Sequence, residues 1–233
     1  MKVEVLFPEF CNLYGEMANI KYLEKCVKDI QIINTSLNST PSFITEDIDL
    51  VYMGPMTEKT QEKVIQKLMP YKEKIQELIE NGKVFLFTGN AFEVLGKYIE
   101  NEDGSKIEGL GILDMYSKRD MLNRYAGMIL GEFDGITMLG FKNQFSQTYG
   151  NNENMYFVKA DKGIGLNPQT KLEGIRYKNS FGTYILGPLF ILNPLFMKKL
   201  LEIIGIEDFE LAFEQEIMAV YNKRLEEFEK LTF

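Results

Sequence analysis

The first half of the chain alternates between short apolar runs and segments with helical periodicity. Apolar runs typical of strands buried in a parallel sheet occur at 3–7, 31–33, 49–53 and 84–87. Between them, apolar residues recur every three or four positions in 20–27 and 57–81, which predicts helices. Pro70 should kink or divide the second helix, because proline has no N–H to donate. This alternation predicts an α/β fold with a central, mostly parallel sheet flanked by helices.

The second half has a different texture, with frequent glycines and short strand candidates between turns. The strand candidates are 125–130, 136–141, 155–158, 174–177 and 183–186. This pattern predicts antiparallel hairpins that extend the sheet in the C-terminal half. Helices are expected at 194–204 and 208–230. We find no repeat and no linker, so we expect one domain over 1–233, in which 206–233 form a C-terminal helical extension.

Charge and composition narrow the possible partners. The 233 residues carry a formal net charge of −8, and a surface of that sign repels phosphate backbones and anionic membranes. We therefore expect no nucleic-acid partner and no membrane partner. No apolar stretch approaches the ~18 residues of a membrane span, and none reads as a signal peptide. The expected location is cytoplasmic, and the sparse cysteines fit a reducing compartment.

The chain contains no histidine, which excludes several kinds of site. A Ser-His-Asp or Cys-His mechanism cannot operate within a chain that lacks imidazole. Cys11 and Cys26 cannot complete a zinc site by themselves. We expect neither a metal nor another cofactor.

A turn after the apolar run 84–87 is the first candidate for chemistry. Thr88-Gly89-Asn90 follows that run and leads into a predicted helix that ends near residue 96. A strand, a tight turn and a helix form a nucleophile elbow, which exposes one side chain beside backbone N–H groups. Thr88 is expected at the exposed position. Most strand-to-helix turns of a parallel sheet share this pattern, so the turn alone does not define a site.

A series of short motifs, which run in order from residue 3 to about residue 204, supports the interpretation of this turn as part of a site. The motifs are Phe7-Pro8, Asn12-Leu13-Tyr14-Gly15-Glu16-Met17-Ala18-Asn19, Gly54-Pro55-Met56-Thr57-Glu58-Lys59-Thr60-Gln61, Gly109-Leu110-Gly111-Ile112-Leu113-Asp114, Arg124-Tyr125-Ala126-Gly127, Gly140-Phe141-Lys142-Asn143-Gln144 and Gly182-Thr183-Tyr184-Ile185-Leu186-Gly187-Pro188. Their order resembles class I glutamine amidotransferases of the cobyric acid synthase (CobB/CobQ) type. Within that family they are most similar to the glutaminase subunits of lipid II isoglutaminyl synthase. The resemblance implies a flavodoxin-like, class I glutamine amidotransferase fold.

The same resemblance shows where this chain departs from the family. The family's nucleophile is the cysteine of a Cys-Gly-Gly-x-Gln elbow, and the resemblance sets Thr88 at that position. The family's histidine base is replaced by Leu186, and a second family histidine by Gln144. A threonine hydroxyl needs a general base to act as a nucleophile, and leucine cannot accept a proton.

The positions expected to form the oxyanion site have changed as well. The resemblance places the oxyanion loop at Gly54, Pro55 and Met56, close to Gly89. Pro55 has no N–H, so one candidate donor is lost. Changes at the nucleophile, the base and the oxyanion loop together predict that glutamine hydrolysis has been lost.

Three residues are candidates for retained ligand binding. Arg124 resembles an arginine near the family's glutamine site, and Asn90 and Asn143 stand in the matched motifs. The resemblance therefore implies a small carboxylate or amide as a possible ligand. The alternative for Arg124 is an ordinary surface arginine on a strand.

Two functions remain open from the sequence. One is a catalytically degenerate amidotransferase-like subunit or binding protein. The resemblance implies that such a subunit would pair with a Mur-ligase-like or other synthetase. The alternative is a divergent glutaminase that hydrolyses glutamine or a related amide with Thr88 or Cys11. A Cys11 sulfur in the pocket beside Thr88 would favour the enzyme, and a thiol buried elsewhere would favour the binding protein.

Overall fold

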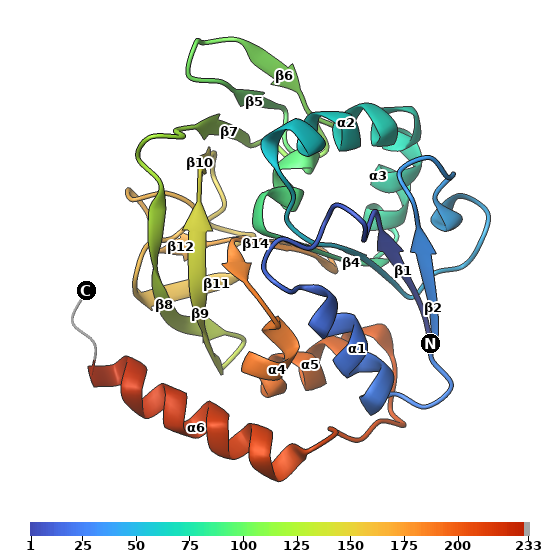
Figure 1. The fold of residues 1–233 in the computed structure, drawn as a ribbon, viewed down its shortest axis with the longest axis vertical. Coiled ribbons are helices and arrows are strands. Elements are labelled where there is room, and N and C mark those ends of the chain that lie inside the picture. Colours follow the sequence, from blue (N-terminus) through green and yellow to red (C-terminus); the bar gives the residue numbers. More distant parts are fainter. Residues whose placement is uncertain (231–233) are drawn as a thin grey trace.

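The computed structural model describes residues 1–230 and has a six-stranded central sheet (Figure 1). Its strand order is β13-β14-β4-β3-β1-β2. The strands are β1 (Lys2–Leu6), β2 (Gln31–Thr35), β3 (Leu50–Met53), β4 (Val84–Thr88), β13 (Ile175–Tyr177) and β14 (Ser180–Thr183). All neighbours pair in parallel except β13 with β14. The predicted α/β class with a mostly parallel sheet is confirmed.

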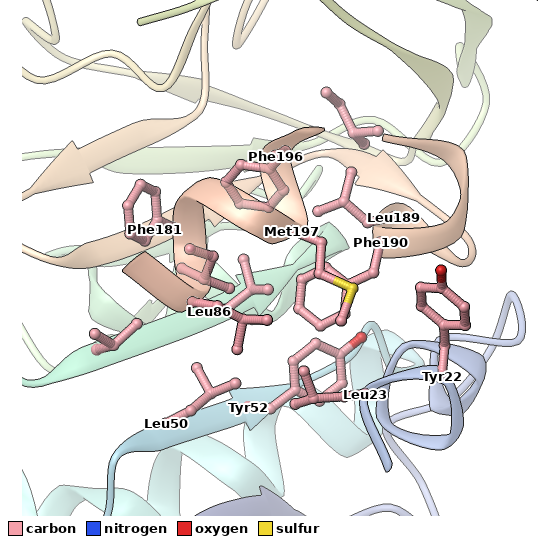
Figure 2. Close-up of a cluster of buried hydrophobic side chains, with 14 of the residues drawn as sticks. Tyr22, Leu23, Leu50, Tyr52, Leu86, Phe181, Leu189, Phe190, Phe196 and Met197 are labelled. Carbon is pink, nitrogen blue, oxygen red and sulfur yellow. The ribbon is translucent and has the colours of Figure 1, made fainter. Parts of the chain in front are cut away.

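Helices cover both faces of this sheet. Strand β3 alternates between two cores, with Leu50 and Tyr52 in one and Val51 and Met53 in the other. Such strands are buried on both faces, which explains their continuous apolar sequences. Helices α1 (Met17–Cys26) and α5 (Pro194–Ile204) supply the first core, and α2 (Glu58–Leu68) and α3 (Lys72–Glu80) supply the second. Figure 2 shows the first core, where Phe196 of α5 packs against Phe181 of β14 with ring centroids 6.0 Å apart and Met197 belongs to the same cluster.

Pro70 divides the long helical segment, as the sequence predicts. A 3₁₀ turn, η2 (Met69–Tyr71), separates α2 from α3. Thr57 caps the start of α2, because its side-chain oxygen accepts a hydrogen bond from the backbone N–H of Thr60 at 3.3 Å. The cap fixes the start of α2 next to the loop that follows β3.

The antiparallel strands of the second half form two further sheets, and only β13 extends the central one. One sheet has the order β12-β11-β8-β9-β15, and the other has the order β10-β7-β5-β6. Their strands are β5 (Tyr98–Glu100), β6 (Lys106–Glu108), β7 (Tyr116–Arg119), β8 (Tyr125–Phe133), β9 (Ile136–Gln144), β10 (Ser146–Tyr149), β11 (Val158–Lys162), β12 (Leu172–Glu173) and β15 (Ile185–Leu186).

The strand expected at 183–186 is divided between two sheets. Thr183 is the last residue of β14 and pairs with Thr88 of β4, whereas Leu186 of β15 pairs with Phe141 of β9. The chain therefore leaves the central sheet at Tyr184. The strand expected at 155–158 begins at Val158, because Met155 and Phe157 hydrogen-bond outside regular pairing.

The remaining short elements are η1 (Ser42–Ile44), η3 (Gly89–Leu95) and α4 (Leu189–Leu192). The last helix, α6 (Glu214–Lys230), begins six residues after the expected position. Phe209 instead forms a β-bridge with Val27, and Phe213 has a φ of 56°. Tyr221 and Phe228 of α6 pack on the β8–β9 hairpin. None of the helices in residues 1–230 is long and apolar enough to cross a membrane.

Candidate functional site

A pocket opens at the carboxyl ends of β3 and β4, where loops from distant parts of the chain meet. Its cavity volume is about 200 Å³. We call it the elbow pocket, and its lining includes Tyr14, Pro55, Gly89, Asn143, Gln144 and Leu186. The carboxyl edge of parallel strands is where sites form in α/β sheets. The structure thus brings together three segments that the sequence analysis placed at one site.

The corner of the turn is Gly89 and not Thr88, which corrects the expectation from sequence, and both residues are buried. Thr88 is fully buried in extended conformation, because it still pairs with Thr183 as the last residue of β4. Gly89 has a φ of 59°, in the left-handed region that glycine adopts without steric cost. A Cβ built on Gly89 would lie 2.5 Å from Cβ of Pro55 and 3.1 Å from Cδ2 of Leu186. The corner therefore points at the loop and at the base position.

The segment after the corner is the 3₁₀ helix η3, where the sequence predicts an ordinary helix. Five of its side chains are buried, including Phe92 and Leu95, and both belong to the second core. Packing of this short segment under the pocket holds the corner in place.

The oxyanion loop has no free donor at Pro55 or Met56. Pro55 lacks an N–H, and the N–H of Met56 donates to Oδ1 of Asn90 at 3.0 Å. Nδ2 of Asn90 donates in turn to the carbonyl of Met56 at 2.8 Å. Asn90 clamps the loop, so both ends of its amide are occupied. Gly54 is required here, because a Cβ would lie 2.4 Å from the carbonyl oxygen of Cys11.

A buried carboxylate, Glu16, binds the backbone that follows Leu186, the position expected for the base. The sequence analysis did not single out Glu16. Leu186 is buried, and the N–H of the next residue, Gly187, donates to Oε1 of Glu16 at 3.2 Å. Oε2 of Glu16 accepts from the N–H of Tyr14 at 2.8 Å. Burial raises the pKa of Glu16. The signal in the sequence was the acid of the Asn-Leu-Tyr-Gly-Glu motif, which was read only as a family mark.

Gln144 and Asn143 present their side-chain amides at the opposite wall. Nε2 of Gln144 donates to the carbonyls of Leu166 and Ser146 at 3.2 and 3.3 Å. Nδ2 of Asn143 donates to the hydroxyl of Tyr14 at 2.5 Å. Oε1 of Gln144 and Oδ1 of Asn143 have no hydrogen-bond partner among the described residues. Two buried acceptors thus remain unpaired beside the pocket.

A second carboxylate, Glu93, lies beneath the pocket and was also missed from the sequence. It is 3% exposed and accepts hydrogen bonds from Tyr184 at 2.6 Å, from Gln61 at 2.9 Å and from Ser146. Burial raises the pKa of Glu93. Ser146 and Tyr184 line the pocket, so Glu93 fixes two of its hydroxyl groups. A lone acid in the apolar run Phe92-Glu93-Val94 was the available signal.

Two other candidates lie outside the pocket. Arg124 is exposed, and its guanidinium sits 5.6 Å from the ring centroid of Phe145, which lines the pocket. The thiol of Cys11 is buried with Sγ 3.9 Å from Sδ of Met56, and burial raises its pKa. Neither residue is among the described residues that line the elbow pocket.

Residues 1–230 contain no group of three or more Cys, Asp or Glu arranged to hold a metal ion. The polar atoms of the pocket are amides, hydroxyls and carboxylates that mostly bond one another. This arrangement can bind a small molecule, but it presents no thiol or imidazole.

The fold and the position of the pocket define a glutamine amidotransferase-like protein. A solved glutamine amidotransferase matches with a TM-score of 0.57 at 14% identity, covering 87% of this chain and 98% of its own. A glutamine amidotransferase from Thermotoga maritima matches with a TM-score of 0.54 at 14% identity, covering 89% and 86%. At these identities the likeness establishes the fold alone.

Comparison with sequence relatives assigns the chain to a particular family of these proteins. The model of the CobB/CobQ-like glutamine amidotransferase domain matches residues 2–192, and the chain belongs to that family. The lipid II isoglutaminyl synthase (glutamine-hydrolyzing) subunit GatD of Staphylococcus aureus is 34% identical, over 78% of this chain and 75% of the relative. The subunit GatD of Streptococcus pneumoniae is 30% identical, over 83% and 76%.

Proposed function

We propose that this chain is a catalytically degenerate glutamine amidotransferase-like subunit that does not hydrolyse glutamine. The observation that carries the proposal is the corner of the elbow. Gly89 occupies the position from which a nucleophile would act, and glycine has neither a thiol nor a hydroxyl. Its missing side chain would meet Pro55 and Leu186, and neither of these side chains can accept a proton.

The corner also changes how the family's elbow motif fits this chain. With the nucleophile at Gly89, the Cys-Gly-Gly-x-Gln pattern falls on Gly89-Asn90-Ala91-Phe92-Glu93. Glu93 then stands at the family's glutamine, and a longer side chain than glycine stands at Asn90. This alignment supports loss of the nucleophile more directly than the threonine substitution did.

The alternative, a divergent glutaminase, has little support from the same geometry. Thr88 is buried in the sheet, and the Cys11 thiol packs against Met56 with its pKa raised by burial. A thiol held in its neutral form is a poor nucleophile. The loop at Pro55 and Met56 also offers no free donor for an oxyanion.

We further propose that the chain acts with a Mur-ligase-like synthetase in cell-wall synthesis, in the cytoplasm. Support comes from its relatives, which are named as subunits of lipid II isoglutaminyl synthase. The acidic, cysteine-poor composition fits that compartment.

A reconstituted complex tests both parts of the proposal. The chain is purified with a Mur-ligase-like synthetase from the same genome, and amidation of the synthetase's substrate is followed. We expect ammonium chloride to supply the nitrogen and L-glutamine to give no product above the blank. Glutamine-dependent amidation would overturn the loss of hydrolysis, and failure of the two proteins to co-purify would overturn the partnership.

A further inference from the structure

The small sheet β10-β7-β5-β6 is buried on one face only. Thr148, Ser117 and Ile99 lie side by side on β10, β7 and β5, and each is at most 2% exposed. Successive side chains of a strand point to opposite faces of a sheet, so the residues on either side of these three point outward. We call this outward surface the tyrosine face. It has two rows across the strands, Tyr149-Tyr116-Tyr98-Glu108 and Gln147-Lys118-Glu100-Lys106.

The three tyrosines of the first row form a continuous stack. The ring centroids of Tyr98 and Tyr116 are 5.1 Å apart at an interplanar angle of 20°, and those of Tyr116 and Tyr149 are 5.6 Å apart at 22°. Within residues 1–230 none of the three hydroxyls has a hydrogen-bond partner, and none is a fully buried unpaired atom. All three hydroxyls are therefore in contact with solvent and can bond a group on another molecule.

The tyrosine face is electrically neutral, although the whole chain carries a formal net charge of −8. Its charged residues are two lysines and two glutamates. Nζ of Lys118 lies 3.1 Å from Oε1 of Glu100, and these side chains are 46% and 25% exposed. Nζ of Lys106 lies 4.1 Å from the ring centroid of Tyr98, and Glu108 is exposed. A second copy of the chain can thus approach this face without the repulsion that its net charge causes elsewhere.

We propose that the tyrosine face binds the same face of a second copy of this chain, about a two-fold axis parallel to the strands. Such an axis sets β7 opposite β5 of the second copy and β10 opposite β6, and every contact occurs twice. Two sheets packed face to face keep their strands roughly aligned, so the two rows stay in register. The association uses no residue that lines the elbow pocket and is independent of the proposed function.

The charged row is complementary to itself in this arrangement. Lys118 lies opposite Glu100 of the second copy, so the ion pair within each chain joins its symmetry mate in a network of four charges. Lys106 lies opposite the uncharged Gln147 of the second copy. No like charges therefore lie directly opposite each other.

The aromatic row supplies the remaining contacts. Tyr116 packs against Tyr98 of the second copy, and the hydroxyl of Tyr149 donates to the carboxylate of Glu108 of the second copy. The four strands have only three or four residues each, so the interface is smaller than that of a stable dimer. We therefore expect a weak, reversible dimer with a Kd on the order of 100 µM.

A charge-reversal experiment tests the two-fold arrangement. Sedimentation velocity of the full chain, from about 10 µM to about 1 mM, measures the Kd. Lys118→Glu and Glu100→Lys each place like charges opposite each other, and each should weaken the dimer at least about tenfold. In an equimolar mixture, position 118 of one variant and position 100 of the other carry opposite charges, and so do the two native residues. Mixed dimers should therefore form with a Kd within about threefold of the wild type.

A second exposed ion pair provides the matched control. Lys74→Glu and Glu77→Lys make the same charge changes on α3 and should leave the Kd unchanged. Thermal unfolding checks that every variant is folded, since an exposed ion pair contributes little to stability. A wild type that stays monomeric up to about 1 mM would overturn the proposal, as would wild-type association of either tyrosine-face variant. A mixture that associates no more tightly than the single variants would overturn the two-fold arrangement.

The tyrosine hydroxyls give an independent test. Tyr149→Phe removes the hydroxyl and keeps the ring, so it should weaken the dimer about threefold or more. Tyr156→Phe makes the same change at a tyrosine that is 37% exposed and outside the tyrosine face, and it should leave the Kd unchanged. Equal Kd values for the wild type and Tyr149→Phe would overturn the contact between Tyr149 and Glu108.

Discussion

At the scale of single residues, Gly89 decides what the elbow can do. Gly89 has a left-handed backbone conformation and lies close to Pro55. The structure therefore has no room for a side chain at residue 89. A cysteine there would cost about 1–2 kcal/mol for the conformation and would also displace Pro55. Restoring a nucleophile therefore requires changing the loop together with the corner.

The first prediction is that a thiol and an imidazole can be rebuilt at this corner. Pro55→Gly with Gly89→Cys makes room for the thiol, and adding Leu186→His places an imidazole beside it. A thiolate–imidazolium pair lowers the thiol pKa, so alkylation at pH 7 should be about tenfold faster with Leu186→His than without it. The rate of iodoacetamide labelling, read by mass spectrometry, measures the difference.

A Thr88→Cys variant is the matched control for this experiment. Its thiol would be buried in the sheet, so Leu186→His should leave its slow labelling unchanged. Native Cys11 and Cys26 are both buried and provide a low background. Acceleration in the Thr88→Cys background, or none in the Gly89→Cys background, would return the nucleophile position to residue 88.

The misplacement of the corner by one residue shows what a residue-level prediction from sequence lacks. The motifs correctly brought Pro55, Leu186 and the turn after β4 together, because loop order follows strand order. Which residue forms the corner depends on where pairing with β14 stops, and Thr88 remains paired with Thr183. Long-range pairing of this kind leaves no periodicity in the local sequence.

At the scale of elements, η3 is tied to the pocket through Glu93. Burial raises the pKa of this carboxyl above its usual value near 4.5. Below a pH of about 4.5, protonated Glu93 makes its full contribution to the free energy of unfolding. It is lost as the pH rises toward the raised pKa, because the unfolded chain ionises first.

The second prediction follows from the raised pKa of Glu93. The free energy of unfolding of the wild type minus that of Glu93→Gln should fall as the pH rises from about 4.5, by up to about 1.4 kcal/mol per unit. Taking the difference cancels the contributions of Glu4, Glu16 and Glu173, whose pKa values burial also raises. Urea unfolding between pH 4 and 7 measures it. A constant or rising difference would show that Glu93 ionises freely in the folded protein.

Helix α6 provides the third prediction, from two adjacent residues. Tyr221 is buried on the β8–β9 hairpin, and its hydroxyl donates to the carbonyl of Thr137 at 2.6 Å, whereas Val220 is 57% exposed. Tyr221→Ala should lower the free energy of unfolding by about 3 kcal/mol, and Val220→Ala should change it by less than about 0.5. Similar losses in both variants would mean that α6 packs with another face.

Elements with strong periodicity were predictable, and those fixed by distant partners were not. Helix α5 matches the expected 194–204, and Pro70 divides α2 from α3 as expected. The late start of α6 depends on the bridge between Phe209 and Val27, far apart in sequence. The sheet that contains β5, β6 and β7 was not anticipated, because its strands are short and half-exposed.

At the scale of the molecule, the family's architecture persists around a changed site. The parallel sheet, the two cores and the pocket at the strand ends are all present. The proposed loss of hydrolysis rests on the corner, the base position and the loop beside them. We interpret this as a scaffold retained for binding and assembly after hydrolysis was lost.

Ammonia release from L-glutamine by the purified chain tests this account most directly. The account predicts a rate equal to the buffer blank, because Gly89 supplies no nucleophile, Leu186 no base, and Pro55 and Met56 no free oxyanion donor. An active glutaminase subunit assayed in parallel shows that turnover would be detected. Ammonia production above the blank that rises in proportion to the concentration of this chain would contradict the central claim.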